Sequence, residues 1–523
     1  MSDIIEPSPF PKKILFMAIG SMGDVLPFVN LGVGFSRRGH NVIIAANLRF
    51  KKLIEARGFE FREISVSITY QWDMQDEWEN TDAGPPAMFK FLNQGIQKAY
   101  KDAERVLLNV DFVILGTGST YMYPECLVRH ISVAFVCFYP YASSKNYAGA
   151  VYGQPFNSLQ WLPFGLSEKI WKAIDGIATY WSSIGLLPIY NQRLKELGLE
   201  HVNKLPSLPG GAFEIDKVPV LHTSNKNLIQ IPPNPNNPLE VQIDYPYSTF
   251  QDELENFVPP EDLANWLSKG NKPIYFGYGS MHSFGGVESR VNMWLNVMNR
   301  LDENHRALFS GVGSVRTPEL RKAISSGRVF LVGHVPHSWL FPRVCCVVHH
   351  GGAGTTHNIA RAGVPSIVVP HFADQPWWAS ILHYHGLAPN GGVPSHSVTS
   401  DKLYTAIFKV LTDEKIHENA QSLGKKIQRE HAKSSPIPNI VLFIEQYWNR
   451  NKWDIISMDD NESIASIDSK EYIESEGSND TDDTIDIEEY VRTSNDNIVK
   501  ENIVKERKLI EPEFVEPDII TVV

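Results

Sequence analysis

Long apolar runs, paired cysteines and a leader-like start are all missing from this sequence. No apolar run in its 523 residues reaches the roughly 18 that suggest a transmembrane helix, and the acidic, proline-rich start is unlike a secretory signal. The four cysteines form no CxxC pair and lie in or beside apolar, strand-like runs. They are Cys126, Cys137, Cys345 and Cys346. We therefore expect a cytoplasmic chain with reduced core thiols and no metal site.

An excess of charge is also missing from most of the chain. The net charge is −12, yet residues 451–523 alone hold 21 acidic and 7 basic residues, which leaves 39 acidic and 41 basic residues for the rest. The body is thus almost neutral and offers no nucleic-acid surface. The acidic segment is rich in Ser, Asn and Asp, so we expect a disordered tail. Its DxD pair, Asp480 and Asp482, is interpreted as part of a solvated acidic run.

The segment at residues 347–356 matches neither of the common phosphate-binding fingerprints, GxxxxGK[ST] and GxGxxG. It reads VVHHGGAGTT, which predicts a buried strand that stops at a histidine, turns on glycines and starts a helix. Such a turn aims backbone N–H groups and the positive end of a helix at one point, and a histidine can donate to a phosphate oxygen. The segment therefore indicates a diphosphate site. A plain glycine-rich connection is the alternative.

A second polar cluster follows the next apolar strand, at residues 364–370. Residues 371–378 read HFADQPWW, and ligands of open α/β sheets bind beyond the carboxyl ends of the strands. Asp374 and Gln375 can hydrogen-bond sugar hydroxyls, and an aromatic face can cover the apolar face of a sugar. The cluster therefore indicates a sugar site. Helix capping by the acid–amide pair, and an ordinary core role for the two tryptophans, are the alternatives.

Strands and helices alternate along both halves of the chain, which predicts the α/β class with doubly wound parallel sheets. In the first half, a strand at 14–18 leads through a helix at 27–38 to a strand at 42–46. Further strands are expected at 111–115, 133–136, 273–281, 306–310, 329–332 and 345–348. The pattern predicts two Rossmann-like domains that face each other across a cleft.

Composition suggests where the domains end. Residues 230–246 are dense in proline and asparagine, so they are interpreted as a linker or surface loop, with the interdomain boundary near residue 245. We therefore expect an N-terminal domain at 1–245, a C-terminal domain at 246–450, and the tail at 451–523.

An apolar insertion at about 156–199 carries few charges and contains Trp161, Trp171 and Trp181. Its pattern is compatible with a buried helix pair packed on the first domain. It is also compatible with a wall for an apolar ligand, or with a patch that touches a bilayer.

The motifs HGGAGTT and PHFADQPWW together resemble the sugar-nucleotide half of the two-domain inverting UDP-glycosyltransferases, glycosyltransferase family 1. Within that family the chain is most similar to the sterol 3-beta-glucosyltransferases and their bacterial antibiotic-glycosylating relatives, over about residues 13–448. The resemblance implies the GT-B fold, with an acceptor-binding N-terminal domain and a nucleotide-sugar-binding C-terminal domain. It also implies that the last helix, near 437–449, crosses back to the first domain.

The resemblance implies which residues bind the donor. Its phosphate contacts match Gly279, Ser280, His350, Gly352, Gly354 and Thr355. Its sugar contacts match Asp374 and Gln375, and its base contacts match the backbone of Val335 and Pro336. Ser280 could instead be only a turn residue, and His349 is interpreted as structural. Backbone dipoles and a histidine would neutralise the diphosphate, so no metal or other cofactor is expected.

The predicted general base is Asp24, in the loop that reads GSMGDVLP at residues 20–27. This loop follows the first strand, and the resembled family has its proposed base there, in the pattern G-[ST]-R-G-D-x-Q-P. A partly desolvated carboxylate at this edge of the sheet would take the proton of an attacking hydroxyl. The alternative is a capping role for a helix that starts at Pro27.

The chain departs from the family pattern at Met22, which replaces an arginine, and at Leu26, which replaces a glutamine. A third departure is Asp244, which stands where a glycine usually precedes aromatic residues, so the interdomain turn is expected to differ. The more apolar loop is compatible with a lipid acceptor. The residues assigned to the acceptor are Ser21, Met22, Trp161 and Trp378.

These observations predict the inverting transfer of a hexose, glucose from UDP-glucose, to the 3-hydroxyl of a sterol. The expected partners are a UDP-sugar, a sterol or other apolar acceptor and, peripherally, a membrane, but no nucleic acid. Three alternatives stay open. The acceptor could be a triterpenoid, polyketide or other lipid, the chain could be a nucleotide-sugar epimerase, or it could sense a sugar nucleotide or lipid without turnover.

Overall fold

The computed structural model describes residues 7–65, 85–139, 185–208, 211–247, 257–279, 286–371 and 374–448, without the side chains of residues 85–93. All of them belong to one compact unit, Met1–Met458. The expected tail at 451–523, most of the apolar insertion at 156–199, and the site candidates Trp161 and Ser280 lie outside the described residues.

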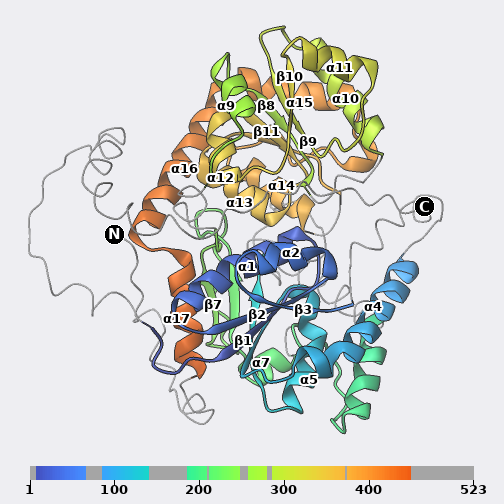
Figure 1. Ribbon diagram of the computed structural model, residues 1–523, viewed down its shortest axis with the longest axis vertical. Helices are drawn as coiled ribbons and strands as arrows, with labels where there is room; N and C mark the ends of the chain where they lie inside the picture. The colour runs from blue at the N-terminus through green and yellow to red at the C-terminus, as the bar shows by residue number, and fades with distance from the viewer. Residues whose placement is uncertain are drawn as a thin grey trace, which may run out of the picture. The chain divides into compact units, whose positions relative to one another are not determined.

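Seven parallel strands form the first sheet, in the order β3-β2-β1-β4-β5-β6-β7 (Figure 1). They are β1 (Lys13–Met17), β2 (Asn41–Ala46), β3 (Glu60–Glu63), β4 (Phe112–Leu115), β5 (Ser132–Cys137), β6 (Val220–Thr223) and β7 (Glu240–Ile243). β1 is an interior strand and helices cover both faces of the sheet, so the apolar side chains of β1 are fully buried. Their alternation sends Ile14 and Phe16 to one core, and Leu15 and Met17 to the other.

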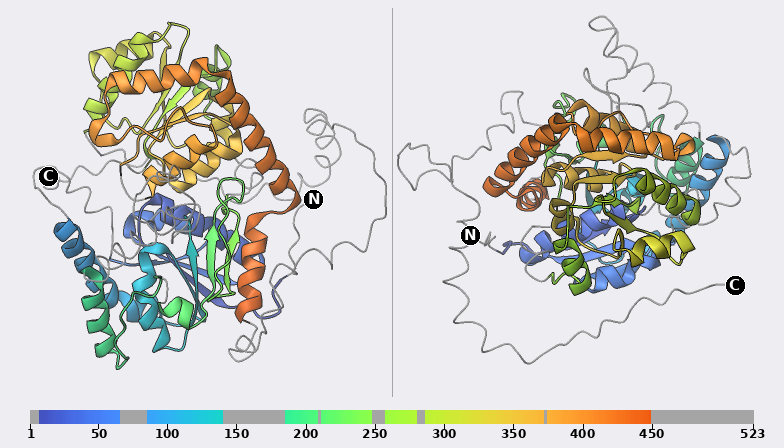
Figure 2. Two further views of the ribbon diagram at one scale, coloured as in Figure 1. Left: turned by 180° about the vertical axis from the view of Figure 1, so that it is seen from behind. Right: turned by 90° about the horizontal axis from the view of Figure 1, so that it is seen from above.

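Helices close these two cores from opposite sides. Those of the first half are α1 (Met22–Arg37), η1 (Leu48–Phe50), α2 (Lys51–Glu55), α4 (Pro85–Val106), η2 (Thr117–Met122), α5 (Tyr123–Leu127) and α7 (Ala212–Ile215). α1 packs Phe28 and Phe35 against Phe16, with ring centroids 5.5 and 5.6 Å apart. On the other face, α4 and the helical residues 185–196 lie side by side (Figure 2).

α1 begins earlier than the sequence analysis expected, at Met22 and not at Pro27. Ser21 is the N-cap: its hydroxyl accepts the Gly23 N–H at 3.1 Å, and the Asp24 carboxylate accepts the Ser21 N–H at 2.7 Å. This reciprocal pair is a capping box, whose S-x-x-D signal is visible in the sequence. Pro27 therefore lies inside the helix, where it removes one backbone hydrogen bond.

β7 lies inside the stretch that was expected to be a linker. The last proline before it is Pro238, and residues Glu240 to Ile243 pair in parallel with β6 as the edge strand of the first sheet. An edge position tolerates flanking prolines, because one side of the strand needs no hydrogen-bond partner. The composition of residues 230–246 therefore hid a short strand at their end.

Five parallel strands form the second sheet, in the order β10-β9-β8-β11-β12 (Figure 1). They are β8 (Ile274–Phe276), β9 (Ala307–Ser310), β10 (Val329–Val332), β11 (Cys346–His349) and β12 (Ser366–Val368). The strand order reverses between β8 and β11, and in the first sheet between β1 and β4. Ligands of open α/β sheets bind at such points, beyond the carboxyl ends of the strands.

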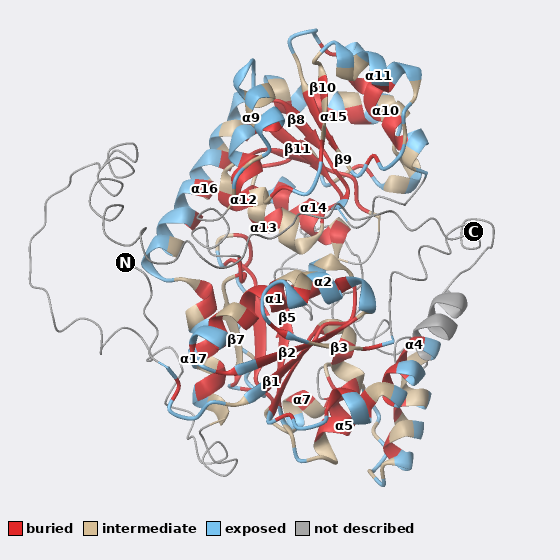
Figure 3. Cartoon of the chain, viewed as in Figure 1, coloured by how far each residue is buried: buried red, intermediate tan, exposed pale blue. Residues whose placement is uncertain are grey.

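Most of the long helices around the second sheet are buried on one face, whereas α14 is buried on nearly every side. They are α9 (Glu261–Ser268), α10 (Val287–Arg300), α11 (Pro318–Ser325), α12 (His337–Leu340), η5 (Phe341–Arg343), α13 (Ala353–Ala362), α14 (Gln375–Tyr384), η6 (Ser395–Ser397), α15 (Ser400–Thr412) and α16 (Glu414–Lys433). In α16 the buried residues Ile416, Ala420, Gly424 and Ile427 form one helical stripe. Figure 3 shows buried strands and exposed outer faces on α11 and α16.

The last described helix, α17 (Pro436–Trp448), packs on α1 of the first half, where its apolar side chains join the core around Phe16 (Figure 2). Glu445, at 5% exposure, accepts from the Arg38 guanidinium at 2.5 Å and pairs with His40 Nε2 at 2.7 Å. Loss of one partner would leave a buried charge uncompensated, so these bonds hold α17 against the first half.

Candidate active site

The N-terminus of α13 is the candidate phosphate site. β11 ends at His349, and the turn through His350, Gly351 and Gly352 leads directly into α13. Gly352 is the N-cap residue and has no side chain to accept first-turn N–H groups, so those of residues 353–355 lack an acceptor within the helix. The turn therefore presents backbone donors together with the positive end of the helix dipole.

Glycines frame the His350 ring on two sides. A Cβ on Gly279, in the turn after β8, would lie 3.0 Å from ring atom Cε1, and a Cβ on Gly352 would lie 2.4 Å from Nε2. Gly279 also has a φ of +55°, in the left-handed region that favours glycine. A side chain at either position would displace the imidazole. Both predicted glycines therefore leave room for the His350 ring.

His350 is a neutral side chain. Burial, with smaller contributions from the charges of His371 and His337, lowers its pKa to about 3. Its Nδ1 is buried with no hydrogen-bond partner among the described residues, whereas Nε2 lies beside Gly352. A neutral imidazole still donates from one ring nitrogen. The ring can therefore offer an anion a hydrogen bond but not a charge.

His349 is placed as a structural residue. It is fully buried, and its Nδ1 accepts the Gly351 N–H at 3.1 Å, which fixes the start of the turn. Burial holds the pKa of His349 well below its usual range, so this ring is neutral too. Gly351 has a φ of +91°, and a Cβ there would lie 2.9 Å from the Gln375 carbonyl oxygen. The turn is thus packed tightly against the start of α14.

The predicted sugar contact Asp374 precedes α14 but does not cap it. Its side chain makes no capping hydrogen bond; instead Oδ2 accepts the indole N–H of Trp378 at 2.8 Å. Burial raises the pKa of Asp374 to about 7, while the indole hydrogen bond acts in the opposite direction. The helix-capping alternative therefore does not hold for Asp374, and its second oxygen is left for a hydroxyl.

The two neighbours of Asp374 that were predicted to touch ligands are both buried. Gln375 is 5% exposed, and its Oε1 accepts the His371 N–H at 2.8 Å. Trp378 was expected to contact the acceptor, but it has no exposed surface and packs edge-on against Trp377 at 4.8 Å. The acceptor assignment is corrected accordingly: Trp378 lies behind Asp374 and orients its carboxylate.

The predicted base, Asp24, is both a helix-capping residue and a carboxylate of raised basicity. Its Oδ2 accepts from the Ser21 N–H at 2.7 Å and from the Ser21 hydroxyl at 3.2 Å. Burial raises the pKa of Asp24 to about 6, against the opposing effects of those bonds and of the Arg49 charge. Both capping bonds use Oδ2, so Oδ1 is the oxygen that could receive a proton.

Asp24 and Asp374 share one electrostatic environment although they belong to different halves of the chain. After burial, the charge of Asp24 contributes to the raised pKa of Asp374. Burial and then these two carboxylates also raise the pKa of Tyr245. In addition, α1 and α13, which begin at the predicted base and at the predicted phosphate site, contact each other. The structure thus brings the predicted base, sugar and phosphate residues into one region.

The remaining predicted residues lie around this region. Val335 is buried after β10, and Pro336 is the N-cap of α12. The next residue, His337, lies near enough to His350 for its charge to affect the His350 pKa. Ser21, Met22, Gly354 and Thr355 are all partly exposed.

A set of contacts between the two halves was not predicted. The Asn225 N–H donates to His357 Nε2 at 3.3 Å, and Asp244 pairs with His431 Nε2 at 2.5 Å. The ring of Tyr245 stacks on His357, with centroids 4.4 Å apart and an interplanar angle of 18°. Asp244, which departs from the family pattern, was the one signal for this junction in the sequence. Its partner, His431, is distant in the chain.

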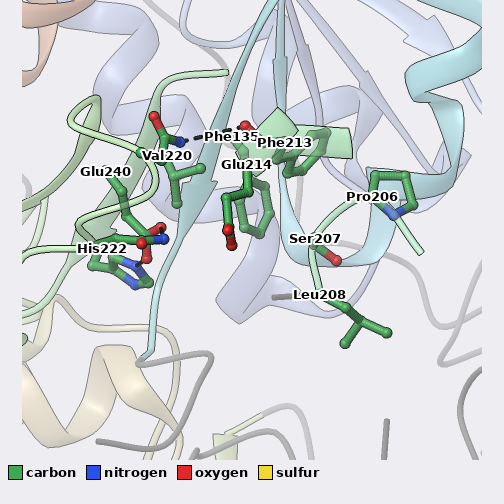
Figure 4. A pocket seen from close by; sticks show the side chains of 11 residues that line it. Phe135, Pro206, Ser207, Leu208, Phe213, Glu214, Val220, His222 and Glu240 are labelled. Carbon is green, nitrogen blue, oxygen red and sulfur yellow. Dashed lines mark hydrogen bonds and ion pairs between the residues drawn. The ribbon is translucent and has the colours of Figure 1, made fainter. Parts of the chain in front are cut away.

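The cavity in Figure 4 lies elsewhere, against β5, β6 and β7 of the first sheet. It is lined by Phe213, Glu214 and an ion pair between His222 and Glu240, whose Nε2 and Oε1 are 2.7 Å apart. The volume open to water there is about 60 Å³, which suits a few water molecules and not a nucleotide sugar. None of the predicted site residues lines it.

Two models of known domain families match separate parts of the chain. Residues 14–123 match the glycosyltransferase family 28 N-terminal domain, and residues 314–444 match the C-terminal domain described as erythromycin biosynthesis protein CIII-like. The first match contains Asp24, and the second contains His350 and Asp374.

Curated relatives carry the same resemblance. The chain is 28% identical over 464 residues to the sterol 3-beta-glucosyltransferase of Vanderwaltozyma polyspora, across 83% of this chain and 35% of the relative. It is 28% identical over 436 residues to the sterol 3-beta-glucosyltransferase UGT80A2 of Arabidopsis thaliana, across 80% of this chain and 64% of the relative. The chain therefore spans less than two thirds of either relative. The resemblance to this group that the motifs predicted is confirmed.

Solved structures share the fold. The glycotransferase of kitacinnamycin matches with a TM-score of 0.59 at 15% identity, over 84% of this chain and 99% of its own. The calicheamicin glycosyltransferase CalG4 matches with a TM-score of 0.55 at 14% identity, over 84% and 99%. The spinosyn rhamnosyltransferase SpnG, complexed with thymidine diphosphate, gives 0.52 at 15% identity, over 80% and 96%. The predicted GT-B fold is confirmed.

Proposed function

We propose that this chain is an inverting glycosyltransferase that moves glucose from UDP-glucose to the 3-hydroxyl of a sterol. The observation that carries the proposal is the electrostatic proximity of Asp24, from the first half, to Asp374, beside the α13 N-terminus in the second half. The similarity to sterol 3-beta-glucosyltransferases supports the choice of sugar and acceptor.

The diphosphate leaving group would bind at the N-terminus of α13. Its negative charge grows as the bond to the sugar breaks, and fixed N–H dipoles stabilise such a charge without having to reorganise. His350 adds a neutral donor, because burial holds its pKa at about 3. We therefore propose that no metal ion or other cofactor takes part in neutralising the leaving group.

The sugar would be held by the acid–amide pair that begins α14. Trp378 fixes Oδ2 of Asp374, which leaves Oδ1 to accept from a hydroxyl of the hexose. With a pKa of about 7, Asp374 can accept from or donate to a hydroxyl near neutral pH. Gln375 uses its Oε1 to accept the His371 N–H, which fixes its amide next to Asp374.

Asp24 would act as the general base. The acceptor oxygen forms a bond to the anomeric carbon, the bond from that carbon to the phosphate oxygen breaks, and the hydroxyl proton passes to Asp24. One displacement from the side opposite the leaving group inverts the anomeric centre. A base with a pKa of about 6 is ionised at pH 7 yet more basic than an ordinary aspartate, which suits proton abstraction in the transition state.

A sterol acceptor is an apolar molecule that lies in a bilayer. Within the described part of the chain, no helix has the length and apolar character to cross one. We therefore propose a peripheral contact with the membrane, through which the sterol reaches the region of Asp24.

The test is to offer the purified chain a panel of UDP-sugars with ergosterol, sitosterol and flavonoids, and to identify products by mass spectrometry. We expect hexosylated sterols with UDP-glucose, and none with the Asp24→Asn variant. Products on another apolar acceptor alone would move the proposal to that acceptor class. UDP-glucose binding without any product would favour the sensor alternative.

A further inference from the structure

The hydroxyl of Tyr245 reaches the candidate phosphate site from the other half of the chain. Tyr245 follows β7 at the edge of the first sheet. Its Oη lies 2.9 Å from the position that a Cβ on Gly354 would occupy, and Gly354 is in the first turn of α13. The hydroxyl therefore lies beside the same backbone donors that the site offers to a diphosphate.

The ring of Tyr245 is held firmly in that position. It is 4% exposed and stacks on His357 at 4.4 Å. His357 is itself fixed, since its Nδ1 lies 2.7 Å from the Ala353 carbonyl and its Nε2 accepts the Asn225 N–H at 3.3 Å. Tyr247 packs edge-on against Tyr245 at 5.3 Å. Because these contacts confine the ring, the position of the Tyr245 hydroxyl oxygen is fixed.

This hydroxyl has no hydrogen-bond partner among the described residues, although the side chain is almost fully buried. Tyr247, two residues further on, has a pairing of its own: its hydroxyl donates to the His357 carbonyl at 3.4 Å. Tyr245 Oη is not one of the fully buried side-chain atoms that lack a partner, so it keeps some accessible surface through which a ligand beside the predicted site could reach it. Burial raises the pKa of Tyr245, which keeps its hydroxyl protonated and able to donate.

We propose that the Tyr245 hydroxyl donates a hydrogen bond to a phosphate oxygen of the nucleoside diphosphate at the α13 N-terminus. This inference rests on the proposed function and adds a donor-binding residue supplied by the first half. The diphosphate is favoured over the acceptor as the ligand, because the hydroxyl lies against the first turn of α13.

The experiment compares Tyr245→Phe with Tyr247→Phe, and measures UDP affinity by calorimetry. Both variants keep the ring and lose one hydroxyl, and both residues are 4% exposed. We expect Tyr245→Phe to weaken UDP binding roughly tenfold, as for a hydrogen bond to a charged group, and Tyr247→Phe to leave it within about twofold. Thermal unfolding of both variants provides the check on folding.

Equal UDP affinity in the wild type and Tyr245→Phe would overturn the inference and leave the proposed function intact. A wild-type chain that binds no UDP would overturn both. Uridine, which lacks phosphate, is the second ligand. If Tyr245→Phe lost as much affinity for uridine as for UDP, the hydroxyl would not be a phosphate contact.

A second pair of variants tests the position of the hydroxyl without any ligand. Gly354→Ala places a methyl group 2.9 Å from the Tyr245 hydroxyl. Its cost in thermal stability should be smaller in the Tyr245→Phe background than in the wild type, since the clashing oxygen is gone. The same cost in both backgrounds would show that the hydroxyl lies elsewhere, and would overturn the inference.

Discussion

Asp24, in the first turn of α1, and Asp374, immediately before α14, come from different halves of the chain, yet the charge of one reaches the other. Burial raises the pKa of Asp374 to about 7, and the Asp24 carboxylate adds to the rise. Two neighbouring carboxylates repel each other when both are ionised. A bound sugar hydroxyl that donates a hydrogen bond to either carboxylate would stabilise its charge against this repulsion.

Asp24→Asn should remove most of the turnover and leave UDP affinity nearly unchanged. Asparagine can still accept from the Ser21 N–H, so the cap on α1 is kept while the base is lost. We expect kcat to fall roughly 10²- to 10⁴-fold, the usual contribution of a general base. Rates come from product formation and UDP affinity from calorimetry. A variant that transfers sugar at the wild-type rate would refute the assignment.

The pH profile should report the same carboxylate. The Asp24 pKa is about 6 because burial disfavours its charged form. The base works only when ionised, so kcat/KM should increase with pH through a midpoint near 6 and fall below it. This acidic limb should be absent from the residual activity of Asp24→Asn. An identical limb in both proteins would assign it to another group.

Asp374→Asn should change the pH dependence of folding stability in a defined direction. The pKa of Asp374 is raised in the folded state, so this group favours folding when protonated and loses that contribution as pH rises from about 4 to above 7. As pH increases, the free energy of unfolding of the variant should therefore increase relative to that of the wild type. Denaturant titrations at several pH values measure this, and a constant difference would contradict it.

Trp378→Phe should weaken the binding of UDP-glucose while leaving the binding of UDP alone unchanged. The variant removes the indole N–H that holds Asp374 Oδ2 at 2.8 Å, and with it an effect that lowers the Asp374 pKa. Trp377→Phe is the matched control, because that neighbouring indole is equally buried. Equal loss of UDP-glucose affinity in both variants would mean that packing, and not the orientation of Asp374, is responsible.

His350→Ala should weaken UDP affinity, whereas His350→Gln should retain more of it. The ring is neutral, since burial lowers its pKa to about 3, so its contribution is a hydrogen bond that glutamine can also donate. We expect a loss of roughly 1 kcal/mol for the alanine variant, about fivefold in the dissociation constant. Unchanged UDP affinity in His350→Ala would refute the phosphate role.

The local parts of the site were predictable from the sequence, because each motif follows a strand and begins a helix. Glycines next to a histidine predict a turn between a strand and a helix, and an acid–amide pair after an apolar strand predicts polar side chains at the end of that strand. The start of α1 was also encoded in the capping box of Ser21 and Asp24, but Pro27, a residue typical of the first helical turn, indicated a later start. β7 was hidden by the prolines that precede it.

Contacts between segments far apart in the chain could not be predicted in the same way. No pattern near Tyr245 indicates that its ring stacks on His357, more than a hundred residues later. Nor does the HFADQPWW motif show which tryptophan donates a hydrogen bond to Asp374. These pairs depend on how the two sheets are brought together, so they follow from tertiary structure and not from local spacing.

The anomeric configuration of the product tests the central claim most directly. The chain is incubated with UDP-glucose, whose sugar is α-linked, and with ergosterol, and the glycoside is analysed by NMR. A single displacement assisted by Asp24 predicts a β-linked glucoside at the 3-hydroxyl, formed by the wild type and hardly at all by Asp24→Asn. An α-linked product, or no hexosylated product with any acceptor in the panel, would contradict the account.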